Sequence, residues 1–315
     1  MAKESKGMKR RDFMVTGIGG ATALGVLKSS GIAGDGAVES KVGRGKMTWR
    51  KLGDTGVKLP IMSMGVMNAQ NPELNKRAYE LGVRHFDTAA VYQMGMNEKM
   101  LGKAIEELGV RKDVVIATKV HIPGSRRGSM TAEEVKNYFL ETVERSLKSL
   151  RTNYIDILYV HNVSDPKYLE NPGIIEAMKT LKKQKKILYP GYTTHTHMEK
   201  VIAHATKMDL YRVVETTFNY SLHLDKSYYE VLKKAAASGV GIIAMKTQCN
   251  QPWYKQRLPG NIQKYYEGEI NHQALLKWVV RHDFICTAIP GVTTFKQIED
   301  DVNVDEKDAF LTDPD

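Results

Sequence analysis

The sequence is poor in cysteine and lacks a long hydrophobic run. It has 315 residues and two cysteines, Cys249 and Cys286, which lie too far apart for a zinc-binding or redox motif. We interpret both as small core side chains and predict no metal site. No segment reaches the roughly 18 consecutive apolar residues that a membrane-spanning helix requires. We therefore do not expect an integral membrane protein.

Recognisable nucleic-acid-binding motifs are also absent, although the net charge is +10. Residues 1–46 contain nine lysines and arginines against four acidic residues, a net of five positive charges, so half of the excess lies in this segment. The body of the chain is therefore only mildly basic. These observations predict no nucleic-acid partner.

A basic pair followed by a weakly apolar stretch marks the amino-terminal segment. Arg10 and Arg11 precede Phe13 and a glycine- and alanine-rich run within MKRRDFMVTGIGGATALGVL (8–27). This order is typical of a twin-arginine export leader. We predict that residues 1–46 are a leader and linker, disordered or cleaved, that the twin-arginine export machinery is a partner, and that the protein is periplasmic. The alternatives are a disordered basic tail and a cytoplasmic location.

Residues 47–315 alternate between strand-like and helix-like segments. LGDTGVKLP (52–60) contains a turn signal and predicts a small hairpin. Most of the strand-like runs are continuously apolar, which favours a closed parallel (β/α)8 TIM barrel with a short amino-terminal β-hairpin. A doubly wound open sheet is the alternative, but no glycine fingerprint follows the first strand. The eight runs are 59–66, 83–88, 113–119, 155–161, 186–193, 212–218, 240–246 and 284–290.

The clearest helix is TAEEVKNYFLETVERSLKSL (131–150), in which apolar residues recur at spacings of three and four. Thr131 and Glu134 at its start predict a capping box. Thr196 and Glu199 have the same spacing and predict a second capped helix before VIAHATKM.

Polar reactive residues follow three successive apolar runs. Asp87 and Tyr92 end VRHFDTAAVY (83–92), Lys119 lies near the end of DVVIATKV (113–120), and His161 follows the third run in IDILYVHN (155–162). Each residue alone is most often structural. In a parallel barrel, however, the carboxyl ends of all strands lie on one face, so these four side chains are expected to converge into an active site.

Six motifs together resemble the aldo/keto reductase superfamily, in particular bacterial members that carry a twin-arginine leader. The resemblance implies a barrel, a nicotinamide cofactor and reduction of a small-molecule carbonyl substrate. It also implies that Tyr92 is the proton donor, with Asp87, Lys119 and His161 around it. The motifs are FDTAAVY (86–92), NEKMLGKAI (97–105), VVIATKV (114–120), SLKSLRTNYIDILYVH (146–161), ALLKWVV (274–280) and AIPGVTTFKQIED (288–300).

The chemistry of the four residues supports these roles. A phenol has a pKa of about 10 and is a weak acid at neutral pH unless its anion is stabilised. The ammonium of Lys119 is expected to stabilise the Tyr92 anion, and Asp87 to keep that lysine charged and oriented. His161 is expected to polarise the carbonyl oxygen through a hydrogen bond.

The cofactor pocket that the resemblance implies departs from the family pattern. Thr193 and Thr194 replace the Ser-Asn pair that usually binds the nicotinamide carboxamide in the family. Thr217 takes the place of a glutamine that usually assists this pair. Met245 replaces a stacking aromatic residue. Lys246 and Thr247 follow the same strand, and Lys246 is expected to contact a cofactor phosphate or a substrate anion; a solvated lysine is the alternative.

After the eighth strand the family often carries two cations that bind the 2′-phosphate of NADPH, and neither is present here. The corresponding positions are Gly291, Thr293, Gln297 and Asp301. The loss weakens the case for NADP(H) over NAD(H), because phosphate recognition favours a guanidinium. Backbone amides near Thr293 and Thr294 could still bind a phosphate. Both cofactors stay open, with NADP(H) favoured by the resemblance.

Two further segments are predicted to face the substrate. Arg126 and Arg127, in HIPGSRRGSM (121–130), supply cations, and aromatic residues after the seventh strand supply apolar walls. Together they suggest a partly apolar carbonyl compound with an anionic group. His195, His197 and His204 invite a metal site, which we do not favour because no carboxylate or cysteine partner is evident. The aromatic residues are Trp253, Tyr254, Tyr265 and Tyr266.

Two other functions compete with carbonyl reduction. Lys119 and Lys246 both end strands, so a barrel lyase that forms a Schiff base is possible. The altered cofactor pocket also fits a nicotinamide-binding regulatory subunit with little turnover. The sequence leaves open the identity of the substrate, the leader cleavage point, the oligomeric state and the way in which an exported nicotinamide would be recycled.

Overall fold

The computed structural model describes residues 47–248 and 271–304. Within them, eight parallel strands form one sheet in the order β10-β9-β8-β7-β6-β5-β4-β3. Isolated parallel bridges from Met62 to Ala288 and from Gly65 to Gly291 join the two edges, so the sheet closes into the predicted barrel. The strands are β3 (Met64–Gly65), β4 (His85–Asp87), β5 (Val115–Val120), β6 (Ile155–Val160), β7 (Ile187–Thr194), β8 (Val213–Thr217), β9 (Gly241–Met245) and β10 (Thr287–Ala288).

The predicted hairpin is present and covers the amino ends of the barrel strands. Strands β1 (Trp49–Lys51) and β2 (Lys58–Pro60) pair antiparallel around the turn η1 (Gly53–Thr55). The backbone amide of Asp54 donates to the carbonyl of Gly239, which precedes β9, and the hydroxyl of Tyr189 in β7 donates to the carbonyl of Thr55. Because this end is covered, the carboxyl end of the barrel is left for a site.

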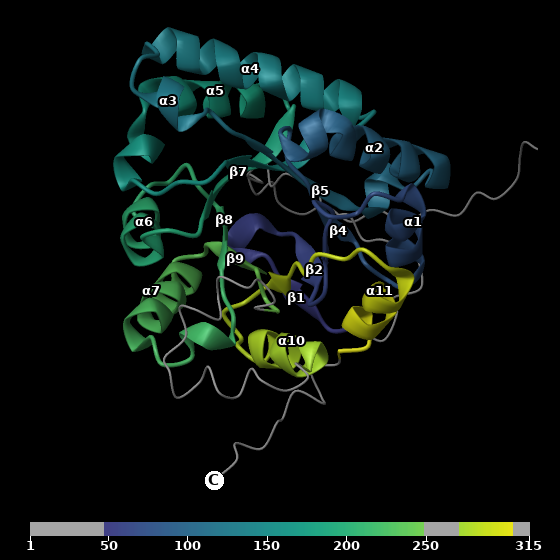
Figure 1. Cartoon of the computed structure of the whole chain (residues 1–315). Helices are drawn as coiled ribbons and strands as arrows, with labels where there is room; N and C mark the ends of the chain where they lie inside the picture. Colours follow the sequence, from purple (N-terminus) through teal and green to yellow (C-terminus); the bar gives the residue numbers. More distant parts are fainter. Residues whose placement is uncertain (1–46, 249–270, 305–315) are drawn as a thin grey trace, which may run out of the picture. The chain divides into compact units, whose positions relative to one another are not determined.

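Helices surround the sheet (Figure 1). They bury apolar side chains against the outer face of the strands, whereas a smaller cluster that includes Leu52, Ile157 and Ile243 fills the interior. The longer helices are α1 (Pro72–Glu80), α2 (Met96–Leu108), α4 (Ala132–Ser149), α5 (Pro172–Lys183), α6 (Met198–Ala205), α7 (Lys226–Ala237), α10 (His272–Val280) and α11 (Phe295–Val302). The short ones are η2 (Tyr92–Gly95), η3 (Arg111–Asp113), α3 (Gly124–Arg127), η4 (Pro166–Glu170) and η5 (Tyr220–Leu222).

One of the two predicted capping boxes is confirmed and the other is wrong. Thr131 and Glu134 cap α4 reciprocally, as their spacing indicates. At α6, His197 occupies the N-cap position with a left-handed backbone (φ 53°), and its side chain makes no capping hydrogen bond. Thr196 therefore lies outside the first turn and cannot form the box with Glu199.

Several predictions fall outside the described residues. They concern the leader and linker at 1–46, Cys249 and the aromatic residues Trp253, Tyr254, Tyr265 and Tyr266. Cys286, the other cysteine, is buried in the interior cluster, as predicted for a small core side chain. In the part of the chain that is described, no helix combines the length and the apolar character needed to cross a membrane.

Candidate active site

The four predicted catalytic residues converge at the carboxyl end of the barrel. Asp87 ends β4, Lys119 is the penultimate residue of β5, His161 follows β6, and Tyr92 opens η2 just after β4. The Nζ atom of Lys119 forms an ion pair with Asp87 and donates to the carbonyl of Thr88 at 2.8 Å. The ring centroids of Tyr92 and His161 lie 5.9 Å apart, edge to face.

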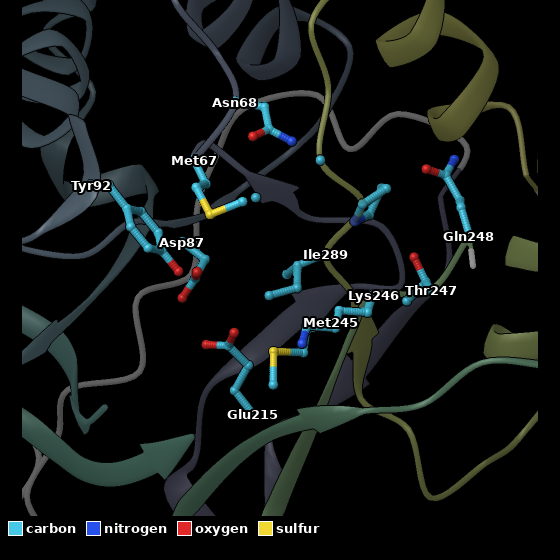
Figure 2. A pocket seen from close by; sticks show the side chains of 13 residues that line it. Met67, Asn68, Asp87, Tyr92, Glu215, Met245, Lys246, Thr247, Gln248 and Ile289 are labelled. Carbon is cyan, nitrogen blue, oxygen red and sulfur yellow. The ribbon is translucent and has the colours of Figure 1, made fainter. Parts of the chain in front are cut away.

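A fifth ionisable residue, Glu215 in β8, belongs to this cluster. Its Oε2 lies 3.3 Å from Nζ of Lys119, and its side chain is as deeply buried as those of Lys119 and Asp87. In Figure 2, Asp87 and Glu215 lie on the wall of the pocket that also carries Tyr92. Two carboxyl groups therefore share one buried ammonium, an arrangement that the sequence analysis did not predict.

Burial and mutual charge set the protonation of this cluster. Burial opposes the charge of Lys119, but Asp87 and Glu215 more than offset it and hold the pKa of the ammonium well above its usual range. Burial, followed by the negative charge of Asp87, raises the pKa of Glu215 to about 8. Burial also raises the pKa of Asp87, while Lys119 lowers it. Lys119 is thus charged, and the two acids together retain a proton at neutral pH.

Opposing effects set the acidity of Tyr92. Lys119 lowers the pKa of the phenol by its charge and as a hydrogen-bond partner, but burial outweighs it and raises the pKa to about 12. Asp87 and Glu215 add to the rise. Lys119 thus stabilises the Tyr92 anion, as predicted, but burial, Asp87 and Glu215 outweigh its effect and leave the phenol a weaker acid than a free one.

His161 is a neutral imidazole. Burial, reinforced by the nearby charge of Lys119, lowers its pKa to about 2. A neutral ring carries one N–H donor, and its Nδ1 has no hydrogen-bond partner within the described structure. His161 can therefore donate to an oxygen atom without itself being an acid at physiological pH.

A cavity of about 190 Å³ opens beside this cluster. Typical ligand sites enclose roughly 300–1,000 Å³, so this cavity is smaller than most. The hydroxyl of Thr247 is buried and has no partner within the described structure. The lining residues are Gly65, Met67, Asn68, Asp87, Tyr92, Glu215, Met245, Lys246, Thr247, Gln248, Ile289, Pro290 and Gly291 (Figure 2).

Four of the ten predicted cofactor-binding residues line this cavity: Met245, Lys246, Thr247 and Gly291. Thr193 and Thr194 do not, because their hydroxyls are engaged locally. The Oγ1 of Thr193 accepts from the amide of Asn162 at 2.9 Å, and that of Thr194 donates to the carbonyl of Thr196 at 3.2 Å.

Thr217 is buried at the end of β8 but does not line the cavity. Glu215, two residues earlier on the same strand, is the polar residue of β8 that faces it. Alternate residues of a strand share a face, so Thr217 and Glu215 lie on the same face of β8, two residues apart.

The remaining three predicted residues belong to α11 and the turn before it. The amides of Thr293 and Thr294 both donate to Oε1 of Gln297, at 2.7 and 3.1 Å, so the helix caps itself with the amides that we expected to bind a phosphate. Asp301 is buried in the last turn, where its Oδ1 accepts from Gln248 at 3.0 Å. Through Gln248 it contacts the cavity wall without lining it.

Of the two predicted substrate cations, Arg127 contacts the segment after β6, where its guanidinium donates to the carbonyl of His161 at 3.3 Å. Arg127 lines a separate open groove next to Tyr168, and its guanidinium carbon is 4.5 Å from the centroid of that ring. Arg126 lies over Tyr138. Neither lines the cavity beside Tyr92. Across residues 47–248 and 271–304, no group of three or more histidine, cysteine or acidic side chains is arranged to hold a metal ion.

Of the cavity residues that the sequence analysis missed, only Glu215 had a detectable signal. An acidic residue inside the apolar run RVVETTF (212–218) must lie in a buried strand, where a carboxyl group needs a partner. Met67, Asn68 and Gln248 lie on loops and show no comparable pattern.

Comparison with known proteins identifies relatives of the whole barrel. The model of the aldo/keto reductase family matches residues 62–255. An uncharacterized oxidoreductase, YrpG, from Bacillus subtilis is 26% identical over 82% of this chain and 91% of its own. A putative voltage-gated potassium channel subunit beta from Schizosaccharomyces pombe is also 26% identical, over 82% of this chain and 88% of its own. The holo form of an aldo-keto reductase from Bacillus halodurans shares the fold, with a TM-score of 0.65, 21% identity and coverage of 85% and 92%.

Proposed function

The chain belongs to the aldo/keto reductase family of oxidoreductases, and from this premise we propose that it interconverts carbonyl compounds and alcohols with a nicotinamide cofactor, with Tyr92 as the proton donor. The observation that carries the proposal is the convergence of Asp87, Tyr92, Lys119 and His161 beside one cavity. Small-molecule carbonyl compounds are the substrate class.

The cavity wall fits the reactive ring of such a cofactor. The buried hydroxyl of Thr247 offers a hydrogen bond, and Met245 offers an apolar surface beside it. A Cβ atom on Gly291 would lie 3.3 Å from Nδ2 of Asn68, so a side chain at position 291 would approach Asn68 across the cavity wall. When bound, the nicotinamide supplies or accepts the hydride.

Tyr92 supplies the proton that the carbonyl oxygen needs. Hydride addition turns this oxygen into an alkoxide, whose conjugate acid is comparable to water, with a pKa of about 15.7. A phenol with a pKa of about 12 is a much stronger acid, so proton transfer from Tyr92 is downhill. Lys119 stabilises the resulting phenolate, and its ion pair with Asp87 keeps the ammonium in place.

His161 orients and polarises the substrate oxygen. Because its imidazole is neutral, it donates an N–H hydrogen bond without competing with Tyr92 as the acid. Its ring packs edge to face against Tyr92, so both donors reach the same region.

A Tyr92→Phe variant tests the proton donor. We expect unchanged nucleotide affinity and a fall in kcat of roughly 10²–10⁴-fold, the usual contribution of a general acid. Tyr154→Phe is the matched control, because Tyr154 precedes β6 at the opposite end of the barrel, where its ring stacks on Arg111. Equal turnover of the two variants with a panel of aldehydes and ketones would remove Tyr92 from the mechanism.

The two competing functions differ in their support. Schiff-base chemistry needs a neutral lysine, whereas Lys119 is held charged by two carboxyl groups. A regulatory role is favoured by the channel-subunit name of one relative. Bound NADPH that stays reduced in the presence of varied aldehydes would support it, and rapid oxidation would support the reductase.

Export through the twin-arginine route is a further part of the proposal, based on Arg10, Arg11 and Phe13. Cell fractionation of the full chain and of an Arg10→Lys, Arg11→Lys variant tests it. A periplasmic wild type and a retained variant are expected; the same cytoplasmic location for both would refute export.

A further inference from the structure

The ionic cluster at the carboxyl end of the barrel contains one more acid than its cation can neutralise. Asp87, Lys119 and Glu215 are all buried, and only Lys119 is basic. The Oδ2 of Asp87 and the Oε2 of Glu215 are buried and have no hydrogen-bond partner within the described structure, and the negative charge of Asp87 raises the pKa of Glu215. Two carboxylates beside one buried ammonium would leave a net negative charge, which a proton on one of them removes.

Although Glu215 is buried from bulk solvent, its side chain lines the cavity. It lines the same wall as Tyr92 and Met245, and it comes from β8, which pairs with the β9 strand that carries Met245 (Figure 2). A ring that lies against Met245 is therefore next to Glu215. The charge of that ring then acts directly on the proton that Glu215 carries.

We propose that Glu215 shares a proton with Asp87 at neutral pH and releases it to solvent when the positively charged ring of an oxidised nicotinamide binds beside it. This inference rests on the proposed function. The reduced ring is uncharged and leaves the proton in place. Through Glu215, the pH would thus change the affinity for the oxidised cofactor relative to the reduced one.

The size of the effect follows from the charge of the ring. A unit positive charge within about 4–6 Å lowers the pKa of a carboxyl group by roughly 1–3 units. Because the pKa of Glu215 is about 8, such a shift takes it to about 5–7 in the complex with the oxidised nucleotide. At pH 7 the free protein holds most of this proton, and the complex has lost between about half and nearly all of it.

The other ionisable groups around Glu215 do not account for a proton released at pH 7 when the oxidised nucleotide binds. Lys119, Tyr92 and Tyr159 all have pKa values above their usual ones, so they keep their protons at pH 7. Glu215 is paired in register with Thr193 in β7 and Ile243 in β9, which do not titrate. The ionisable residues that face it are Asp87 from β4, Lys119 from β5, Tyr159 from β6, Tyr92 from η2 and Lys246 after β9.

The test is calorimetric titration of the full chain with NADP⁺ and NADPH, and with NAD⁺ and NADH, at pH 7 in two buffers of different ionisation enthalpy. We expect between about half a proton and nearly one proton to be released with the oxidised nucleotide, and almost none with the reduced one. Glu215→Gln should bind both and release none. Glu98→Gln is the matched control, since Glu98 is also buried, with a raised pKa, but hydrogen-bonds Thr118 and does not line the cavity.

The possible results separate this inference from the proposed function. Failure of all four nucleotides to bind would overturn both. Binding with equal proton release by the wild type and Glu215→Gln would overturn the role of Glu215 alone. If Glu215→Gln does not fold, the wild type still decides: its affinity for the oxidised nucleotide should rise up to tenfold per pH unit between pH 6 and 8, and a flat profile would overturn the inference.

Discussion

Replacement of Asp301 by asparagine should stabilise the protein at neutral and alkaline pH. Asp301 is buried in the last turn of α11, where burial, followed by the charge of Asp300, raises its pKa from 3.8 to about 7. Its one hydrogen bond, from Gln248, goes to Oδ1, and the amide oxygen of asparagine can accept the same bond. The substitution therefore removes an unfavourable charge and keeps the contact.

The magnitude follows from proton linkage. Between pH 3.8 and 7 the folded protein holds a proton on Asp301 that the unfolded chain has lost, so stability falls as the pH rises through this range. A shift of about 3 pK units corresponds to about 4 kcal/mol at 1.36 kcal/mol per unit. The asparagine side chain does not titrate, so the variant should gain up to this amount over the wild type above pH 7 and nothing below pH 4.

Urea unfolding of the full chain between pH 4 and 9 measures this difference. Asp209→Asn, at an exposed aspartate, is the control and should follow the wild-type curve. A stability difference between Asp301→Asn and the wild type that does not change with pH would refute the reasoning, because the raised pKa would then be absent.

Three further substitutions test other parts of the structure. His161→Leu should lower kcat by roughly 10²–10³-fold, as loss of one oxyanion donor does; unchanged kcat would exclude the hydrogen bond. Gly191→Ala should lower the free energy of unfolding, measured in urea, by about 1–3 kcal/mol, because its Cβ would lie 2.5 Å from the carbonyl oxygen of Val213. An unchanged unfolding midpoint would show that β7 and β8 move apart at this position without cost. Thr131→Ala should cost about 1 kcal/mol by loss of the α4 cap, and no loss would mean that water replaces the hydroxyl.

Most of the fold could be predicted from local patterns in the sequence. The eight apolar runs correspond to β3–β10, and the Thr131 capping box begins α4 as its spacing indicates. These elements depend on residues close together in the chain, so periodicity and turn chemistry are sufficient to find them. The failed cap at Thr196 shows the limit, because the left-handed backbone of His197 displaces the helix start by one residue.

The candidate site was predicted in part. Strand ends located Asp87, Tyr92, Lys119 and His161, because the barrel brings every such end to one face. The hydrogen-bond partners of the predicted cofactor residues could not be predicted, because a pattern along one segment does not reveal whether Thr193 or Gln297 bonds to a neighbouring residue.

The sequence by itself determined the barrel and the chemical types of groups that meet at its open end, since strand periodicity and the positions of strand ends are local properties. Only the tertiary structure decided how those groups ionise. Lys119 stays charged, His161 stays neutral and Tyr92 becomes a weaker acid because burial and the second carboxyl group of Glu215 act across strands that are far apart in the chain. Desolvation and charge depend on distances in space, which no spacing along the sequence contains.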